Sequence, residues 1–221
     1  MKQFLKQNSL SIVLFGFFLV FLLALSVTGY LHENEEMAAH AQPAVTYVEY
    51  ITSGGFVEAV FENWESEFLQ MGALVVLTIW LVQKGSADSK KLRGKDDVDT
   101  SSRYSIIYAS SWANRKKAAG KALYANSLSL ALFGLFFVSL ILHAIGGTAA
   151  ANQEAVLHHQ ETMGVLEYVR SSQFWFESFQ NWQSEFLAVG ALLVLSIFLR
   201  QRGSPESKPI GEPNKATGSS K

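Results

Sequence analysis

Two short stretches of the chain share the motif Asn-Trp-x-Ser-Glu-Phe-Leu, and their polar side chains could do chemistry together. The Asn, Ser and Glu stand at i, i+3 and i+4, which places them on one face of a helix. A carboxylate inside an apolar span is expensive unless it faces water or the bundle interior, so paired glutamates could hold a proton or cation. A helix dipole also favours an acid in its first turn, so capping explains the same pattern. This candidate polar site comprises Asn63, Ser66, Glu67, Asn181, Ser184 and Glu185.

Histidines offer weaker candidates. His40 and His158, with Glu36 and Glu161 nearby in sequence, are weak candidates for a divalent metal outside a membrane. Loop histidines without fixed spacing are usually solvated, so we predict no metal site. A membrane haem needs two histidines facing each other across spans. Only His143 lies in an apolar block, so we expect no haem and no other cofactor.

Composition excludes several classes of protein. The chain of 221 residues has no cysteine, which rules out disulfide scaffolds, thiolate zinc sites and cysteine nucleophiles. It contains no Gly-rich phosphate loop, GxSxG elbow or HExxH motif. The net charge of -1 provides no global basic field for nucleic acid. We therefore expect a protein that is not an enzyme and does not bind nucleic acid.

Four apolar blocks must position these residues: Leu10–Tyr30, Phe68–Val82, Leu128–Ile145 and Phe186–Leu199. About 20 helical residues span a hydrocarbon core of ~30 Å. The second and fourth blocks are shorter, but each follows an amphipathic aromatic stretch that can extend its helix. The pattern predicts an all-α integral membrane four-helix bundle with amphipathic extracytoplasmic extensions.

The extension before the second block predicts one helix of roughly thirty residues, from about Gly54 to Gln83. Serines suit the starts of such helices, and glycines suit their ends and close contacts between spans. We expect caps at Ser53 and Ser171, helix C-termini at Gly85 and Gly203, and close packing at Gly16, Gly72, Gly134 and Gly190.

The chain contains a tandem duplication at a constant offset of 118 residues. Between Ser53–Lys90 and Ser171–Lys208, 21 of 38 positions are identical. Each copy holds two spans, so both point the same way, as a parallel repeat about an axis along the membrane normal. The predicted organisation is a first two-span repeat (1–90), a cytoplasmic linker with an interfacial helix near 104–117 (91–118), a second two-span repeat (119–208) and a disordered tail (209–221).

Basic residues set the predicted orientation. The two loops 31–67 and 146–185 hold one of the 18 lysines and arginines, and the other 17 fall on the opposite side. The positive-inside rule therefore places both termini in the cytoplasm. It also places Trp64 and Trp182 as interface aromatics at the outer surface.

The repeated motifs, including Asn-Ser-Leu-Ser-x-x-Leu-Phe-Gly, resemble a bacterial family of integral membrane proteins of unknown function with a tandemly duplicated two-helix unit. The resemblance implies a multi-pass protein of the bacterial inner (plasma) membrane and supplies no activity. We expect a non-enzymatic structural or accessory component. The alternative is a small proton or cation transporter or channel using Glu67 and Glu185. The expected partner is the lipid bilayer, with a homo-oligomer or a membrane-protein partner left open.

Cysteine labelling tests the orientation. Cysteines placed at Ser53 and Ser171 should react with an impermeant reagent added to intact cells, because both positions precede extracytoplasmic helices. A cysteine at Ser101, in the basic middle loop, should react only after lysis. Labelling of Ser101→Cys in intact cells would contradict the topology.

Overall fold

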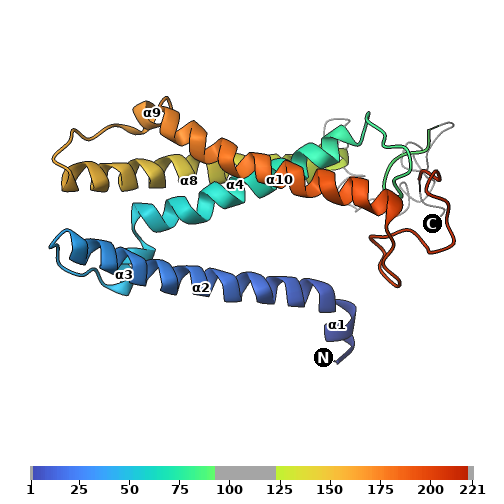
Figure 1. Cartoon of the computed structure of the whole chain (residues 1–221), viewed down its shortest axis with the longest axis horizontal. Coiled ribbons are helices and arrows are strands. Elements are labelled where there is room, and N and C mark those ends of the chain that lie inside the picture. Colours follow the sequence, from blue (N-terminus) through green and yellow to red (C-terminus); the bar gives the residue numbers. More distant parts are fainter. Residues whose placement is uncertain (1, 93–122, 219–221) are drawn as a thin grey trace. The chain divides into compact units, whose positions relative to one another are not determined.

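The computed structural model describes residues 2–92 and 123–218, and the regular elements in them are helices. Helix accounts for 70% of these residues and the described part has no strand, which confirms the all-helical class. The predicted interfacial helix at 104–117 and most of the linker lie outside the described residues. The helices are α1 (Lys2–Gln7), α2 (Ser9–Ala39), α3 (Tyr47–Ile51), α4 (Gly54–Leu77), α8 (Ser127–Leu157), α9 (Val165–Tyr168) and α10 (Ser172–Phe198) (Figure 1).

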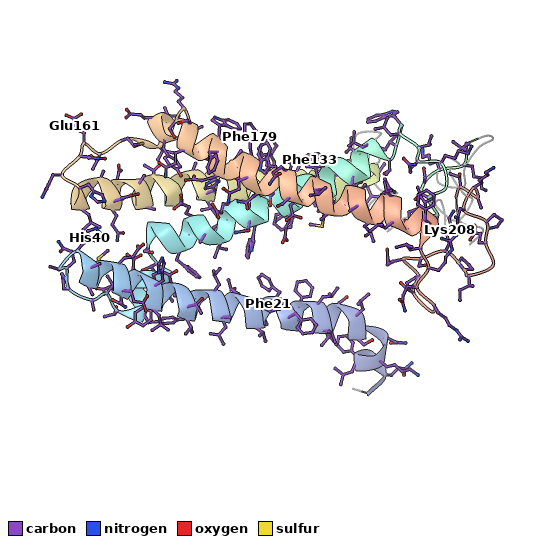
Figure 2. The ribbon with its side chains drawn as sticks, in the orientation of Figure 1. Phe21, His40, Phe133, Glu161, Phe179 and Lys208 are labelled. Carbon is purple, nitrogen blue, oxygen red and sulfur yellow. The ribbon has the colours of Figure 1, made fainter. Side chains whose placement is uncertain are left out.

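Three of these helices, α2, α8 and α10, are long and apolar enough to cross a membrane. Their apolar side chains are largely exposed within the chain. Phe21 on α2, for example, is 68% exposed (Figure 2). An apolar surface of this extent is rare in soluble monomers and suits contact with lipid. The long apolar helices and their exposed apolar side chains are therefore typical of a membrane protein.

The residues form two compact units, each of which combines separate parts of the chain. The first unit contains Met1–Phe61 and Ile141–Trp175, so it includes α1, α2, α3, α9, the starts of α4 and α10, and the end of α8. The second unit contains Glu62–Leu140 and Phe176–Lys221. The unit boundaries fall inside α4, α8 and α10.

Helix α4 ends earlier than the sequence predicts, at Leu77 rather than near Gln83. The Thr78 hydroxyl donates to the Leu74 carbonyl at 2.8 Å, and the next amides bond three residues back, from Ile79 to Val76 and from Trp80 to Leu77. Such bonds tighten the last turn and end an α-helix. α4 is not among the three helices that meet the length and composition of a span.

The glycines expected at helix C-termini lie further along the chain. Gly85 and Gly203 do have positive φ angles, +92° and +84°, which glycine adopts without strain. However, both lie in turns beyond the ends of α4 and α10. In each turn the serine that follows the glycine donates its amide to the Gln two residues before the glycine, Ser86 to Gln83 and Ser204 to Gln201.

Several local hydrogen bonds recur at the offset of 118. The predicted caps are confirmed, because the hydroxyls of Ser53 and Ser171 accept the amides of Phe56 and Phe174. Asparagine side chains fasten the loops after α2 and α8. Asn34 exchanges two hydrogen bonds with the Val45 backbone, and Asn152 exchanges the same two with Met163.

The segment after α10 differs from the predicted disordered tail as far as residue 218. Lys208 is only 2% exposed, and its ammonium donates to the carbonyls of Asn214 and Ala216. Arg200 donates to the Glu212 carbonyl at 3.0 Å. Within the second unit the segment also reaches the turn after α4, where the Gly85 amide donates to the Thr217 hydroxyl. The charged side chains of Lys208 and Arg200 thus donate hydrogen bonds to backbone carbonyls and hold the segment in turns.

Close packing occurs at other glycines than those expected. A Cβ added at Gly16, Gly134 or Gly190 would meet nothing within 4 Å, so packing at these three positions was wrongly predicted for the described chain. A Cβ at Gly72 would lie 3.3 Å from the Phe133 ring. The tight contacts lie instead at Gly54 and Gly146.

Helices α4 and α8 touch backbone to backbone in the first unit. A Cβ added at Gly54 would lie 2.7 Å from the Gly146 carbonyl oxygen, and one at Gly146 would lie 2.6 Å from the Glu58 amide nitrogen. No real Cβ tolerates such distances to backbone, so both positions require glycine. The contact fixes the start of α4 against α8.

Alanine substitution tests this contact. Gly146→Ala should lower stability by about 1–3 kcal/mol, because the two helices must separate to admit the methyl group. Gly134→Ala is the matched control on the same helix, and alanine's better helix propensity should leave stability equal or higher there. Thermal unfolding of the purified protein in detergent measures both. Equal effects of the two substitutions would contradict the packing.

Candidate cation site

The first residue of the site is Glu58, in the second turn of α4. The helix starts after the Ser53 cap, and the Gly54 and Gly146 contact presses this end of α4 onto α8. The Glu58 backbone therefore lies beside α8, and the residue is half-buried there.

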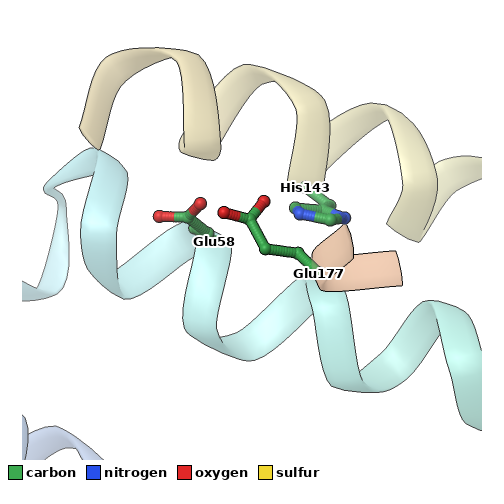
Figure 3. Close-up of side chains that lie close together, drawn as sticks. All are labelled: Glu58, His143 and Glu177. Carbon is green, nitrogen blue, oxygen red and sulfur yellow. The ribbon is translucent and has the colours of Figure 1, made fainter. Parts of the chain in front are cut away.

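His143 is the second residue, one turn before Gly146 on α8. Its side chain is completely buried, and a ring nitrogen lies within 4.8 Å of a Glu58 carboxylate oxygen (Figure 3). The Phe174 ring stacks on the imidazole, with centroids 4.9 Å apart and planes at 29°. The Phe174 ring thus covers one face of the buried imidazole.

Tyr168 holds the Glu58 carboxylate from the other side. Its hydroxyl donates to Glu58 Oε1 at 2.9 Å, and the whole side chain is buried. The ring fits against Gly147, where any side chain would overlap it, and packs edge-on to Phe174 with centroids 5.7 Å apart. One hydrogen bond and two ring contacts thus link Glu58, Tyr168, Phe174 and His143.

Glu58 and His143 therefore bring one carboxylate and one imidazole together within the first unit. Imidazole nitrogen and carboxylate oxygens are groups that bind protons and divalent cations.

The residues predicted from the repeated motif lie elsewhere, in the second unit. Glu67 is exposed on α4, and Glu185 is half-buried on α10. The hydroxyls of Ser66 and Ser184 donate to carbonyls of their own helices, those of Asn63 at 2.7 Å and Asn181 at 2.8 Å. These bonds give the two serines a local structural role.

The fully buried acid near the motif is Glu65 rather than Glu67. Glu65 has no exposed surface, and the indole of Trp182 donates to its Oε1 at 3.2 Å. Trp182 also packs edge-on against Phe136, with centroids 6.1 Å apart. Trp182, expected to be an interface aromatic, thus also binds a buried carboxylate, and Trp64 is partly buried.

The histidines expected to be solvated are exposed and in contact. The rings of His40 and His158 meet edge to face with centroids 5.6 Å apart, and both side chains are exposed. His40 Nδ1 lies 2.9 Å from the Glu36 carbonyl oxygen. The carboxylate and imidazole that the first unit brings together belong to Glu58 and His143, so this pair contains neither His40 nor His158.

Sequence reasoning missed the pairing of Glu58 with His143, although the duplication marks both residues. At the offset of 118 their counterparts are Phe176 and Leu25, which are both apolar. The residues around them are repeated, since Tyr50, Phe56 and Gly29 correspond to Tyr168, Phe174 and Gly147. Ionisable residues that replace apolar ones within a repeated framework are the signal that could have found the site.

Comparison with known proteins identifies the family. The chain matches a domain of unknown function (DUF6766) over residues 1–219 and belongs to that family. No curated protein matches the chain. No solved structure matches it either.

The tyrosine hydroxyl gives a sharp test of the site. Tyr168→Phe should lower stability by about 1–3 kcal/mol, because it removes a hydrogen bond to a partly buried carboxylate and leaves the ring in place. Tyr50→Phe, at the equivalent position of the first copy, is the matched control. Its counterpart acid position is Phe176, so it should cost less. Chemical or thermal unfolding in detergent measures both, and an equal loss would argue against the Tyr168–Glu58 bond.

Proposed function

We propose that this member of the DUF6766 family is a non-enzymatic inner-membrane protein that binds a cation or proton at Glu58 and His143 and passes it through the membrane. The observation that carries the proposal is the fully buried His143 beside the Glu58 carboxylate, within a helix long and apolar enough to cross a membrane. Ionisable groups in such helices are costly and typically mark ion or proton pathways.

We further propose that the chain is a four-span bundle of two parallel two-span copies. The sequence identities at the offset of 118 support this arrangement, and so do the asparagine and serine hydrogen bonds that recur at the same offset. The contact between the equivalent residues His40 and His158 is typical of residues near a twofold axis. Helix α4 is the short member, and local thinning of the bilayer can accommodate a short span.

The proposed location is the bacterial inner membrane, with both termini cytoplasmic. The support is the distribution of lysine and arginine, 17 of 18 on one side. In this orientation the start of α4 and of α10 faces the outside, so Glu58 lies toward the extracytoplasmic end of the bundle. A cation would then enter from the outer surface, whose loops are acidic.

A structural or accessory role is the second candidate, and one observation favours it. The Tyr168–Glu58 bond and the Phe174–His143 stack connect α4, α8, α9 and α10 and could serve packing alone. A homo-oligomer or a membrane-protein partner would suit such a role. The other candidate ion site is the pair Glu67 and Glu185, which occupy the same position in the two copies of the repeated motif.

Flux measurements in liposomes distinguish these functions. The purified full-length chain should carry protons or divalent cations down an imposed gradient. Glu58→Gln and His143→Leu should each reduce that flux at least about tenfold, because the coupling groups are lost. Glu35→Gln and His32→Gln, on exposed positions of α2, should leave it unchanged.

The same flux measurement is made on two further variants, Glu67→Gln and Glu185→Gln. If they abolish flux while Glu58→Gln does not, the ion site lies in the repeated motif. If the well-folded wild-type protein carries no proton or divalent cation, the structural role stands and the transport proposal fails.

A further inference from the structure

We propose that the first unit binds an organic cation with an apolar body, in a groove between the ends of α2 and α8. The groove has a volume of about 480 Å³, which is within the usual range of small-molecule sites. Its walls come from the ends of the two helices and from the loops that follow them, all within the first unit. The apolar residues of these walls are Met37, Pro43, Val45, Ala149, Val156 and Leu157.

Asparagine side chains hold both loops that line the groove. Asn34 exchanges two hydrogen bonds with the backbone of Val45, which lines the groove. Asn152, another lining residue, exchanges two with the backbone of Met163. The walls are therefore in place before any ligand binds, as is usual for small-molecule sites.

The groove lies beyond the apolar blocks of both helices. The block in α2 ends at Tyr30, and Met37 follows seven residues later, ~10 Å further along the helix. The block in α8 ends at Ile145, and Val156 follows eleven residues later on the same helix. If the two blocks span the hydrocarbon core, lipid tails do not reach the groove. Its apolar walls are then available to a ligand that arrives from water.

The charge around the groove favours a cation. The two segments that carry its lining residues, 33–46 and 149–164, contain five glutamates and no lysine or arginine. One of these acids lies at the groove itself, because Glu33 Oε1 accepts a hydrogen bond of 2.8 Å from the lining residue Gln153. Charge of one sign around a cleft raises the local concentration of ligands of the opposite sign. An organic cation with an apolar body therefore matches both the walls and the charge of the groove, whereas a neutral or anionic ligand matches only the walls.

Two ions of nearly the same shape and opposite charge test the inference, tetraphenylphosphonium and tetraphenylborate. Equilibrium dialysis measures the binding of each ion to the purified full-length chain in a neutral detergent, at about pH 8, where an unperturbed imidazole is neutral. We expect saturable binding of one tetraphenylphosphonium per chain. It should be at least about tenfold tighter than the binding of tetraphenylborate, which the glutamates repel. Higher ionic strength should weaken the binding of the cation.

Substitutions test whether the cation binds in the groove. Val156→Trp, at a lining position that is 62% exposed, should remove the saturable binding because the indole fills the groove. Val48→Trp is the matched control, since Val48 is 66% exposed on α3, outside the groove, and should bind the cation as the wild type does. Circular dichroism and gel filtration check that each variant is folded.

A second pair of variants tests the charge. Glu33→Gln should weaken tetraphenylphosphonium binding about two- to fivefold, the effect of one partly exposed charge. Glu206→Gln, at an exposed position in the turns after α10, should leave it unchanged.

Three results would overturn the inference. Equal binding of the two ions would show that the groove takes apolar ligands without regard to charge. Saturable binding that persists in folded Val156→Trp would place the cation elsewhere on the protein. Absence of saturable cation binding to the folded wild type would reject the ligand class.

The inference does not depend on the proposed function. Selective binding of the organic cation without any ion flux would establish the groove and reject transport. Flux that depends on Glu58, without selective binding, would leave transport standing and overturn the assignment of the groove.

Discussion

The backbone contact between α4 and α8 at Gly54 and Gly146 is the constraint on which the first unit depends. Two helices that approach this closely have room for no Cβ at the crossing, and the residues that flank it are brought together. Glu58 then lies beside Gly146 of α8, and His143 lies one turn before Gly146 on the same helix. Tyr168 reaches Glu58 because its ring occupies the space that Gly147 leaves. The positions of these glycines therefore determine where the polar cluster can form. In a membrane, van der Waals packing is one of the forces that bring helices together.

Local features of the fold followed from the sequence because their causes are local. Apolar blocks predicted the long helices α2, α8 and α10, and serine hydroxyls predicted the starts of α4 and α10. The predicted end of α4 was wrong because apolar content continues through Val82, whereas the amides of Ile79 and Trp80 bond three residues back and the helix ends at Leu77. Apolar composition predicts which residues can be buried, but it does not predict where the backbone hydrogen bonds of a helix change.

The candidate site could not be predicted in the same way, because its members are far apart in the chain. The sequence singled out His143 only for haem and did not single out Glu58. Nothing in their local sequence says that α4 crosses α8 at Gly146. The motif around Glu67 drew attention because it is repeated, yet identity between copies here marks framework residues such as Ser66 and Ser184. The departures from the repeat were more informative than the matches.

The apolar counterparts of Glu58 and His143 have a consequence for symmetry. A dimer made of two identical half-length chains would place every interface residue twice, so it would hold two such clusters or none. Two such clusters would double the number of ionisable groups among the apolar helices. Covalent fusion of the halves removes that requirement. Leu25 in the first half and Phe176 in the second half stand at the positions equivalent to His143 and Glu58, so the ionisable pair occurs at one of the two equivalent places. The single chain can thus be symmetric in framework and asymmetric in chemistry, which no homodimer of the half-length unit could achieve.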